Sequence, residues 1–211
     1  MKLLSSLVLL FFLSLSCNQA SQKEKTPETK TGKGDSIPTT KTEPTNNPYA
    51  GIDVSPMDMS YYPADYPKLK MTNSNTTPPL ARVIYSRPHL QGRHLFHEVL
   101  KYEEPWRLGA NESSEIDFYN DVTIQNKKIK AGRYIIYCIP HPGNWSIVLN
   151  SNIDSWGLQQ DPTKDIAHFI VPVNETSNHL EYYTMIFEKK DTAAELVMAW
   201  DNLEARLPIS F

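Results

Sequence analysis

Apolar and polar residues alternate along several short segments of the chain, and this period of two is typical of half-buried β-strands. The first such segments are Leu80–Ser86 and Glu115–Ile124. More follow toward the C-terminus: Arg133–Ile139, Trp145–Asn150, Asp165–Val173, Leu180–Glu188, Glu195–Asp201 and Glu204–Ser210. The pattern therefore predicts about eight strands.

Polar turn signals separate these segments and complete the prediction of the fold. They are Gln125–Lys128, His141–Asn144, Gln160–Pro162, Asn174–Asn178 and Lys189–Thr192. Short strands joined by polar turns, without a long amphipathic helix, predict an all-β fold: a single antiparallel β-sandwich, with a jelly roll as one variant. The apolar side chains expected between its faces are Ile147, Leu149, Phe169, Val171, Met185, Phe187, Leu196 and Met198.

Residues 1–16 have the pattern of an export signal. Lys2 supplies a positive charge, Leu3–Leu13 form an apolar run too short to span a bilayer, and small residues precede Cys17. A cysteine at this place resembles a bacterial lipobox, although Ser14 stands where leucine is usual. We expect a lipoprotein signal peptide and a lipid on Cys17 that anchors the chain. The alternative is an ordinary secretory signal cut near Cys17.

Residues 17–47 are expected to be the lipidated cysteine and a disordered tether. The stretch is rich in Thr, Lys and Pro and has no aromatic residue, so it cannot offset the entropy lost on ordering. Asn18 gives no clear signal for retention in the inner membrane, which favours the outer membrane. The predicted domain spans residues 48–211, and Tyr61, Tyr62 and Tyr66 are expected in a proline-kinked lead-in across its surface.

Charge and cysteine content argue against several functions. The formal net charge is −3 and the predicted domain has no basic run, so nucleic acid is not expected as a partner. Cys138 is the second of only two cysteines, so the chain is not a disulfide scaffold. Within its predicted strand, Cys138 is expected to be a small buried apolar residue rather than a reactive thiol.

The segment Tyr85–Glu112 mixes charges, aromatic rings and glycines more densely than any other. Guanidinium groups bind carboxylates and phosphates through paired hydrogen bonds, and aromatic rings offer stacking surfaces. One interpretation is a pocket for an anionic or sugar ligand, formed by Arg87, Arg93, Trp106, Arg107, Asn111 and Glu112. The other is an internal network in which Arg87 or Arg107 pairs with Glu112 and fixes the fold. The two can coexist.

Metal binding and catalysis have weaker support. His89, His94 and His97 lie close together, but no HxH or HExxH spacing occurs. On a strand, His94 and His97 would point to opposite faces. There is no GxSxG motif and no glycine-rich phosphate loop. We therefore expect no metal, no cofactor and no catalytic residue.

Several motifs resemble the DUF2911 family, and the resemblance covers roughly Ser55 to Phe211. His97 departs from the family pattern, in which a glycine is expected after the phenylalanine. The resemblance implies an exported, β-rich domain, commonly a lipoprotein of Bacteroidota, and it implies no activity. The residues that carry it are Tyr85–Pro88, Gly92 and Arg93, Trp106–Glu112 (WRLGANE), Asp121–Val122, Ala131–Tyr134, Ile139–Pro140, and Trp145 with Asn150.

Together these features predict an outer-membrane lipoprotein of the cell envelope, facing the periplasm or the surface. Its domain is expected to bind a ligand, anionic or glycan, or an envelope protein, without catalysis. The alternative is an envelope enzyme that hydrolyses a glycan or an ester with the Arg/Trp/Glu cluster around WRLGANE. Asp35-Ser36-Ile37 resembles the Asp-Ser/Thr-apolar sequon of Bacteroidota O-glycosylation, so Ser36 is a candidate modification site.

Overall fold

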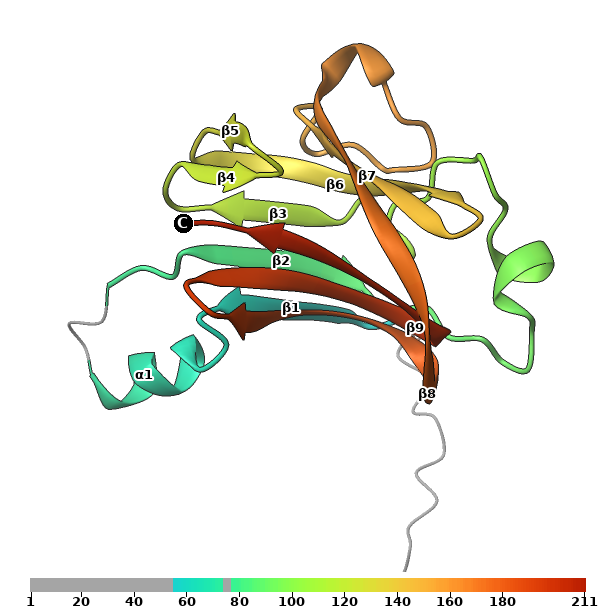
Figure 1. Cartoon of the computed structure of the whole chain (residues 1–211), viewed down its shortest axis with the longest axis horizontal. Coiled ribbons are helices and arrows are strands. Elements are labelled where there is room, and N and C mark those ends of the chain that lie inside the picture. The colour runs from blue at the N-terminus through green and yellow to red at the C-terminus, as the bar shows by residue number, and fades with distance from the viewer. Residues whose placement is uncertain (1–54, 74–76) are drawn as a thin grey trace, which may run out of the picture. The chain divides into compact units, whose positions relative to one another are not determined.

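Seven antiparallel strands form one curled sheet in the order β1-β2-β3-β6-β7-β8-β9 (Figure 1). The computed structural model describes residues 55–73 and 77–211. A separate ribbon pairs β4 (Val122–Ile124) with β5 (Lys127–Ile129). The strands of the large sheet are β1 (Met57–Tyr62), β2 (Ala81–Ser86), β3 (Glu115–Phe118), β6 (Gly132–His141), β7 (Asn144–Asn150), β8 (Asp165–Lys190) and β9 (Ala193–Ile209).

Helical structure in the described part of the chain is limited to short segments. They are α1 (Tyr66–Thr72), an irregular turn at Leu95–Val99, and a 3₁₀ turn at Pro162–Lys164. Within these ranges, no helix is long and apolar enough to cross a membrane. The expected signal peptide, the lipidated Cys17, the tether and Ser36 lie outside the described residues.

The prediction of an all-β antiparallel fold is confirmed. The finer prediction of a two-layered sandwich is not confirmed, because the strands lie in one large sheet that curls into a half-barrel (Figure 1). All eight side chains expected in the core are buried, and Cys138 is fully buried as well. The lead-in is more regular than expected, since Tyr61 and Tyr62 belong to β1, and Tyr66 begins α1.

β8 replaces two of the predicted strands. A turn was expected at Asn174–Asn178, but β8 runs through it. The polar residues there are accommodated by irregularities in the β8–β9 register, between Glu175 and Leu180 and between Leu180 and Thr184. Bulges of this kind bend a strand without ending it. β8 can therefore pair with β7 in its first half and with β9 in its second half.

The segment after β2 joins the second half of β8 and holds the curl of the sheet. The main-chain N–H of Leu90 donates to the carbonyl of Glu181 (3.0 Å), and the N–H of Tyr183 donates to the carbonyl of Pro88 (2.9 Å). Further along β8, the N–H of Phe187 donates to the hydroxyl of Ser60 in β1 (3.3 Å). These bonds satisfy polar groups at sheet edges that would otherwise stay open to other chains.

His97 adopts a backbone conformation that suits glycine. Its φ of 88° and ψ of −39° lie near the γ-turn, which is rare and strained for residues with a side chain. The side chain is exposed, so no tight packing compensates the strain. The glycine that the family resemblance leads us to expect at this position therefore has a backbone reason.

Replacing His97 with glycine is expected to stabilise the fold by about 1 kcal/mol, because it removes strain of that order. The melting temperature should rise by about 2–4 °C. Thermal unfolding of residues 18–211 would measure this, since every residue of the hydrophobic core lies within them. His94→Gly is the matched control, because His94 is also exposed but has a φ of −77°. A melting temperature that fails to rise in His97→Gly would contradict the strain.

Candidate functional site

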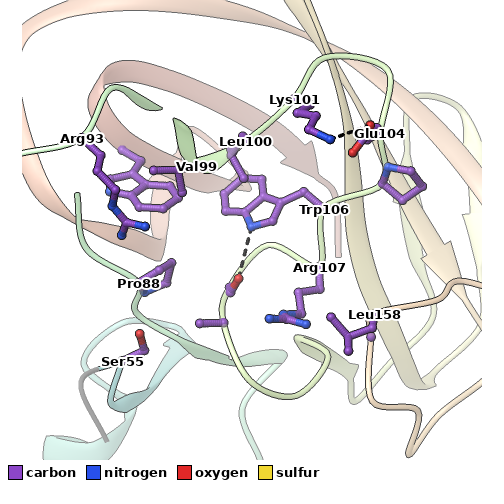
Figure 2. Close-up of a pocket in the computed structure, with 15 residues that line it drawn as sticks. Ser55, Pro88, Arg93, Val99, Leu100, Lys101, Glu104, Trp106, Arg107 and Leu158 are labelled. Atoms are coloured by element: carbon purple, nitrogen blue, oxygen red, sulfur yellow. Dashed lines mark hydrogen bonds and ion pairs between the residues drawn. The ribbon is translucent and has the colours of Figure 1, made fainter. Parts of the chain in front are cut away.

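A cleft of about 420 Å³ opens beside the WRLGANE motif (Figure 2). This volume falls in the range of small-molecule sites. The lining comes from the segments before and within WRLGANE, from the loop between β7 and β8, and from β9. Its charged members are Arg93, Lys101, Glu104 and Arg107, and its larger apolar members are Pro88, Val99, Leu100, Pro105, Trp106, Leu158 and Trp200.

One wall of the cleft is the loop 106–114, which main-chain and side-chain bonds fix to the core. Trp106 and Cys138 exchange two main-chain hydrogen bonds, of 2.7 and 2.8 Å. The Ser114 hydroxyl donates to the carbonyl of Leu108 (2.8 Å), and Leu108 is fully buried. Arg107 is therefore held between two buried neighbours.

Gly109 is closely packed in this loop. A Cβ at this position would lie 3.0 Å from both the Ser114 hydroxyl and the Ser86 carbonyl oxygen. The Gly109 carbonyl also accepts a hydrogen bond from the indole N–H of Trp106 (3.2 Å). A side chain at this position would be tighter than ordinary packing, so Ser114 or the β2 backbone would have to move by a few tenths of an ångström.

Trp106 is mainly a core residue. Only 8% of it is exposed. Its ring stacks on Trp200 with centroids 5.7 Å apart, and it meets Trp145 and Tyr183 edge to face. A ligand ring could stack on Trp106 only by displacing these neighbours, so the residue offers the cleft a small apolar area.

Arg107 is the charged group that the fold leaves unpaired in the cleft. Among the described residues it makes no hydrogen bond and no ion pair within 4 Å. Partial burial lowers the pKa of Arg107, and the negative charge of Glu112 acts against this at longer range. Because arginine stays charged at any physiological pH, the site holds a partly desolvated cation.

Arg93 adds a second positive charge to the lining, from another segment (Figure 2). It donates to the carbonyls of Leu90 (2.8 Å) and His89 (2.9 Å), which fix its position without neutralising its charge. The other charges, Lys101 and Glu104, pair with each other at 3.3 Å. The cleft therefore has a net positive lining.

Arg87 lies in a separate network that joins β1, β2 and β8. It donates to the Tyr183 carbonyl and the Thr184 hydroxyl, both at 3.3 Å, and pairs with Asp58 at 3.4 Å. Tyr85 also donates to Asp58, and burial raises the pKa of Tyr85 to about 12. The expected fold-fixing network is thus present around Arg87, with Asp58 as its acid in place of Glu112.

Of the six predicted ligand-binding residues, Arg93, Trp106 and Arg107 line the cleft. Arg87, Asn111 and Glu112 do not. Asn111 has a φ of 59°, a left-handed conformation that asparagine tolerates, so it shapes the turn of WRLGANE.

Sequence reasoning missed the contribution of the loop between β7 and β8, where Gly157 and Leu158 line the cleft. The available signal was an apolar Trp156-Gly157-Leu158 triplet outside any strand pattern.

The histidines near this region do not converge. His89 stacks on Tyr182 with centroids 5.1 Å apart, while His94 and His97 are exposed in the following turn. Within residues 55–73 and 77–211, no group of three or more His, Cys, Asp or Glu side chains could hold a metal ion.

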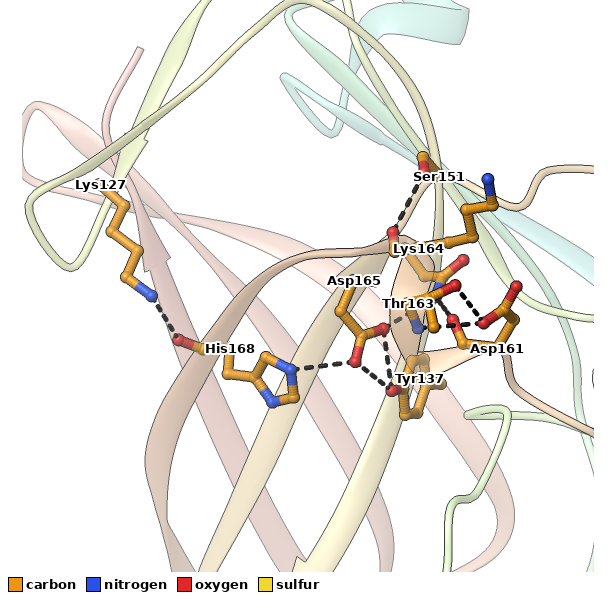
Figure 3. Close-up of polar contacts among 9 residues, drawn as sticks. Lys127, Tyr137, Ser151, Asp161, Thr163, Lys164, Asp165 and His168 are labelled. Atoms are coloured by element: carbon orange, nitrogen blue, oxygen red, sulfur yellow. Dashed lines mark hydrogen bonds and ion pairs between the residues drawn. The ribbon is translucent and has the colours of Figure 1, made fainter.

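A second polar cluster centres on Asp165 (Figure 3). Its carboxylate accepts from the Tyr137 hydroxyl (3.0 Å) and the Asn150 amide (2.8 Å), and His168 Nε2 lies 3.0 Å from it. Burial, followed by the hydrogen bond to Asp165, raises the pKa of Tyr137. An aspartate that orients a histidine is a feature of acid–base sites. In the described part of the chain, however, no Ser, Thr or Cys side chain bonds His168, so the contacts explain how β6, β7 and β8 are joined.

Comparison with family models gives a match over residues 68–209 to the family described as "Protein of unknown function (DUF2911)". The chain belongs to the DUF2911 family. No curated protein and no solved structure matches it significantly. In this DUF2911 chain, the YSRP motif supplies the network around Arg87, and the WRLGANE motif builds a wall of the cleft.

The two arginines of these DUF2911 motifs should respond differently to removal of their charge. Arg87→Met is expected to lower the free energy of unfolding by about 1–2 kcal/mol, because hydrogen bonds to Tyr183 and Thr184 are lost. Arg107→Met should leave stability unchanged or raise it slightly, since no bond among the described residues is lost and a desolvated charge is removed. Urea unfolding of residues 18–211 measures both. Equal losses in the two variants would show that Arg107 is also structural.

Proposed function

We propose that this DUF2911 protein is a lipid-anchored protein of the cell envelope whose domain binds a small anionic ligand in the cleft. The observation that carries the binding function is Arg107, which faces the cleft without a bond or ion pair among the described residues. Binding sites keep such unsatisfied charges because the ligand supplies the missing partner. Arg93 brings a second fixed cation to the same space.

A binding role fits the cleft better than hydrolysis. Glu112 is exposed and does not line the cleft, so it is poorly placed to serve as an acid or base there. Glu104 lines it but is paired with Lys101. General acid–base chemistry needs a group within reach of the bound ligand. The described lining supplies arginines and apolar groups, which favour recognition.

An anion that binds the cleft should raise the melting temperature of residues 18–211. At about 100 times its Kd, a ligand stabilises the folded state by about 2.7 kcal/mol. We expect such a shift with at least one of phosphate, sulfate, glucuronate or octanoate, and none with glucose. The shift should disappear in Arg107→Met.

The matched control is Arg133→Met, which removes an arginine that pairs with Glu115 and Asp117 away from the cleft. This variant should keep the ligand-induced shift. Absence of any shift in the wild type, or the same shift in Arg107→Met, would contradict binding at this site.

The membrane anchor is proposed from the lipobox-like sequence ending at Cys17. In cells of a bacterium that lipidates its exported proteins, the full chain should incorporate labelled palmitate and sediment with membranes. Cys17→Ser should lose the label and enter the soluble fraction. Cys138→Ala, which alters the only other cysteine, should keep both properties. A Cys17→Ser protein that is still labelled would rule out this anchor.

A further inference from the structure

The loop between β7 and β8 presents apolar side chains to solvent, and one of them, Leu158, lines the cleft. Leu158 lines the cleft and is 72% exposed, and its neighbour Trp156 is 58% exposed. Ile153, in the same loop, is 42% exposed. Several exposed apolar side chains in one short loop are typical of a surface that a ligand or a partner covers, and Leu158 continues this surface into the cleft.

This loop is fixed in place by its contacts with the WRLGANE side of the cleft. A Cβ on Gly157 would lie 2.5 Å from the Ser113 hydroxyl, so the two backbones are in close contact there. The hydroxyls of Ser113 and Ser155 share a hydrogen bond of 3.2 Å, and Gln160 donates to the Gly157 carbonyl (3.2 Å). These contacts therefore fix the loop in a conformation in which Leu158 is exposed.

Apolar lining and positive charge lie side by side in the cleft. Leu158, Val99 and Leu100 line the same cleft as Arg107 and Arg93 (Figure 2). The aromatic residues of the lining offer little stacking surface, because Trp106 and Trp200 cover each other. An aliphatic chain can follow such a surface, whereas a sugar or an aromatic ring finds no free aromatic face on which to stack.

We propose that the ligand of the cleft is an amphiphilic anion with a single alkyl chain. Its carboxylate or phosphate head pairs with Arg107, with Arg93 as the second cation, and its chain lies against Leu158, Val99 and Leu100. Charge complementarity selects the anionic head, and the apolar lining and rim select the chain. This inference rests on the proposed anion-binding function and names the class of its ligand.

The test is a chain-length series titrated into residues 18–211 by isothermal calorimetry below the micelle concentration. The probes are butanoate, hexanoate, octanoate and decanoate, with octyl phosphate to distinguish the two head groups and decanol as the uncharged match. Affinity should rise about two- to fourfold per added methylene while the chain still lies in the cleft. Decanol should bind at least tenfold more weakly than decanoate.

Two variants locate the chain and the head. Leu158→Ala should weaken decanoate binding about fivefold and butanoate binding less, because a longer chain has more apolar contact to lose. Ile153→Ala is the matched control from the same loop, and it should leave both unchanged because Ile153 does not line the cleft. Arg107→Met should abolish binding of every carboxylate in the series.

The outcomes separate this inference from the proposed function. If affinity depends on Arg107 but is the same from butanoate to decanoate, the inference of an alkyl chain is overturned and the proposed anion site is kept. Length-dependent affinity that survives both Leu158→Ala and Arg107→Met would place the binding elsewhere and overturn the inference. If no member of the series binds but phosphate, sulfate or glucuronate binds through Arg107, the inference of an amphiphilic ligand is overturned. If no anion binds at all, both proposals fail.

Discussion

The structure depends on the contact between the segment that follows β2 and the second half of β8. Main-chain bonds from Leu90 and Pro88 to Glu181 and Tyr183 hold together parts of the sheet that are far apart in strand order. The buried Tyr85 hydroxyl accepts from the Met185 N–H at 2.9 Å and adds a side-chain link. Without these bonds the sheet could flatten, and the aromatic core around Trp106 and Trp200 would lose its cover.

This contact also separates two kinds of arginine that look alike in the sequence. Arg87 lies at the contact itself, where carbonyl, hydroxyl and carboxylate oxygens all face its guanidinium group. Arg107 lies between the buried Trp106 and Leu108 and faces the cleft, where the fold provides no acceptor among the described residues. The difference comes from β8 and β1, since the second half of β8 supplies the carbonyl and hydroxyl oxygens that Arg87 uses and Asp58 in β1 supplies the carboxylate.

Sequence patterns predicted most strands because alternation reports which side of a strand is buried, and the eight expected core residues confirm it. They failed at Asn174–Asn178, where a polar run resembles a turn but the bulged β8 continues, paired with β9. They also gave no means of assigning Arg87 and Arg107 to different places. Asp58 pairs with Arg87, and the Leu158 loop lines the cleft together with Arg107. Both are distant in sequence from these arginines, and only the folded sheet brings them close.

Because sequence patterns do not separate structural residues from binding residues, the cleft of the folded protein is the best place to look for function. A sequence motif such as WRLGANE combines residues that serve the fold, Trp106, Leu108 and Gly109, with one that does not, Arg107. Keeping a partly desolvated cation costs stability, and among the described residues the charge of Glu112 offsets that cost only at longer range. A bound ligand can compensate features that weaken the isolated fold, and our proposal assigns the unpaired arginine and the exposed Leu158 to one such ligand.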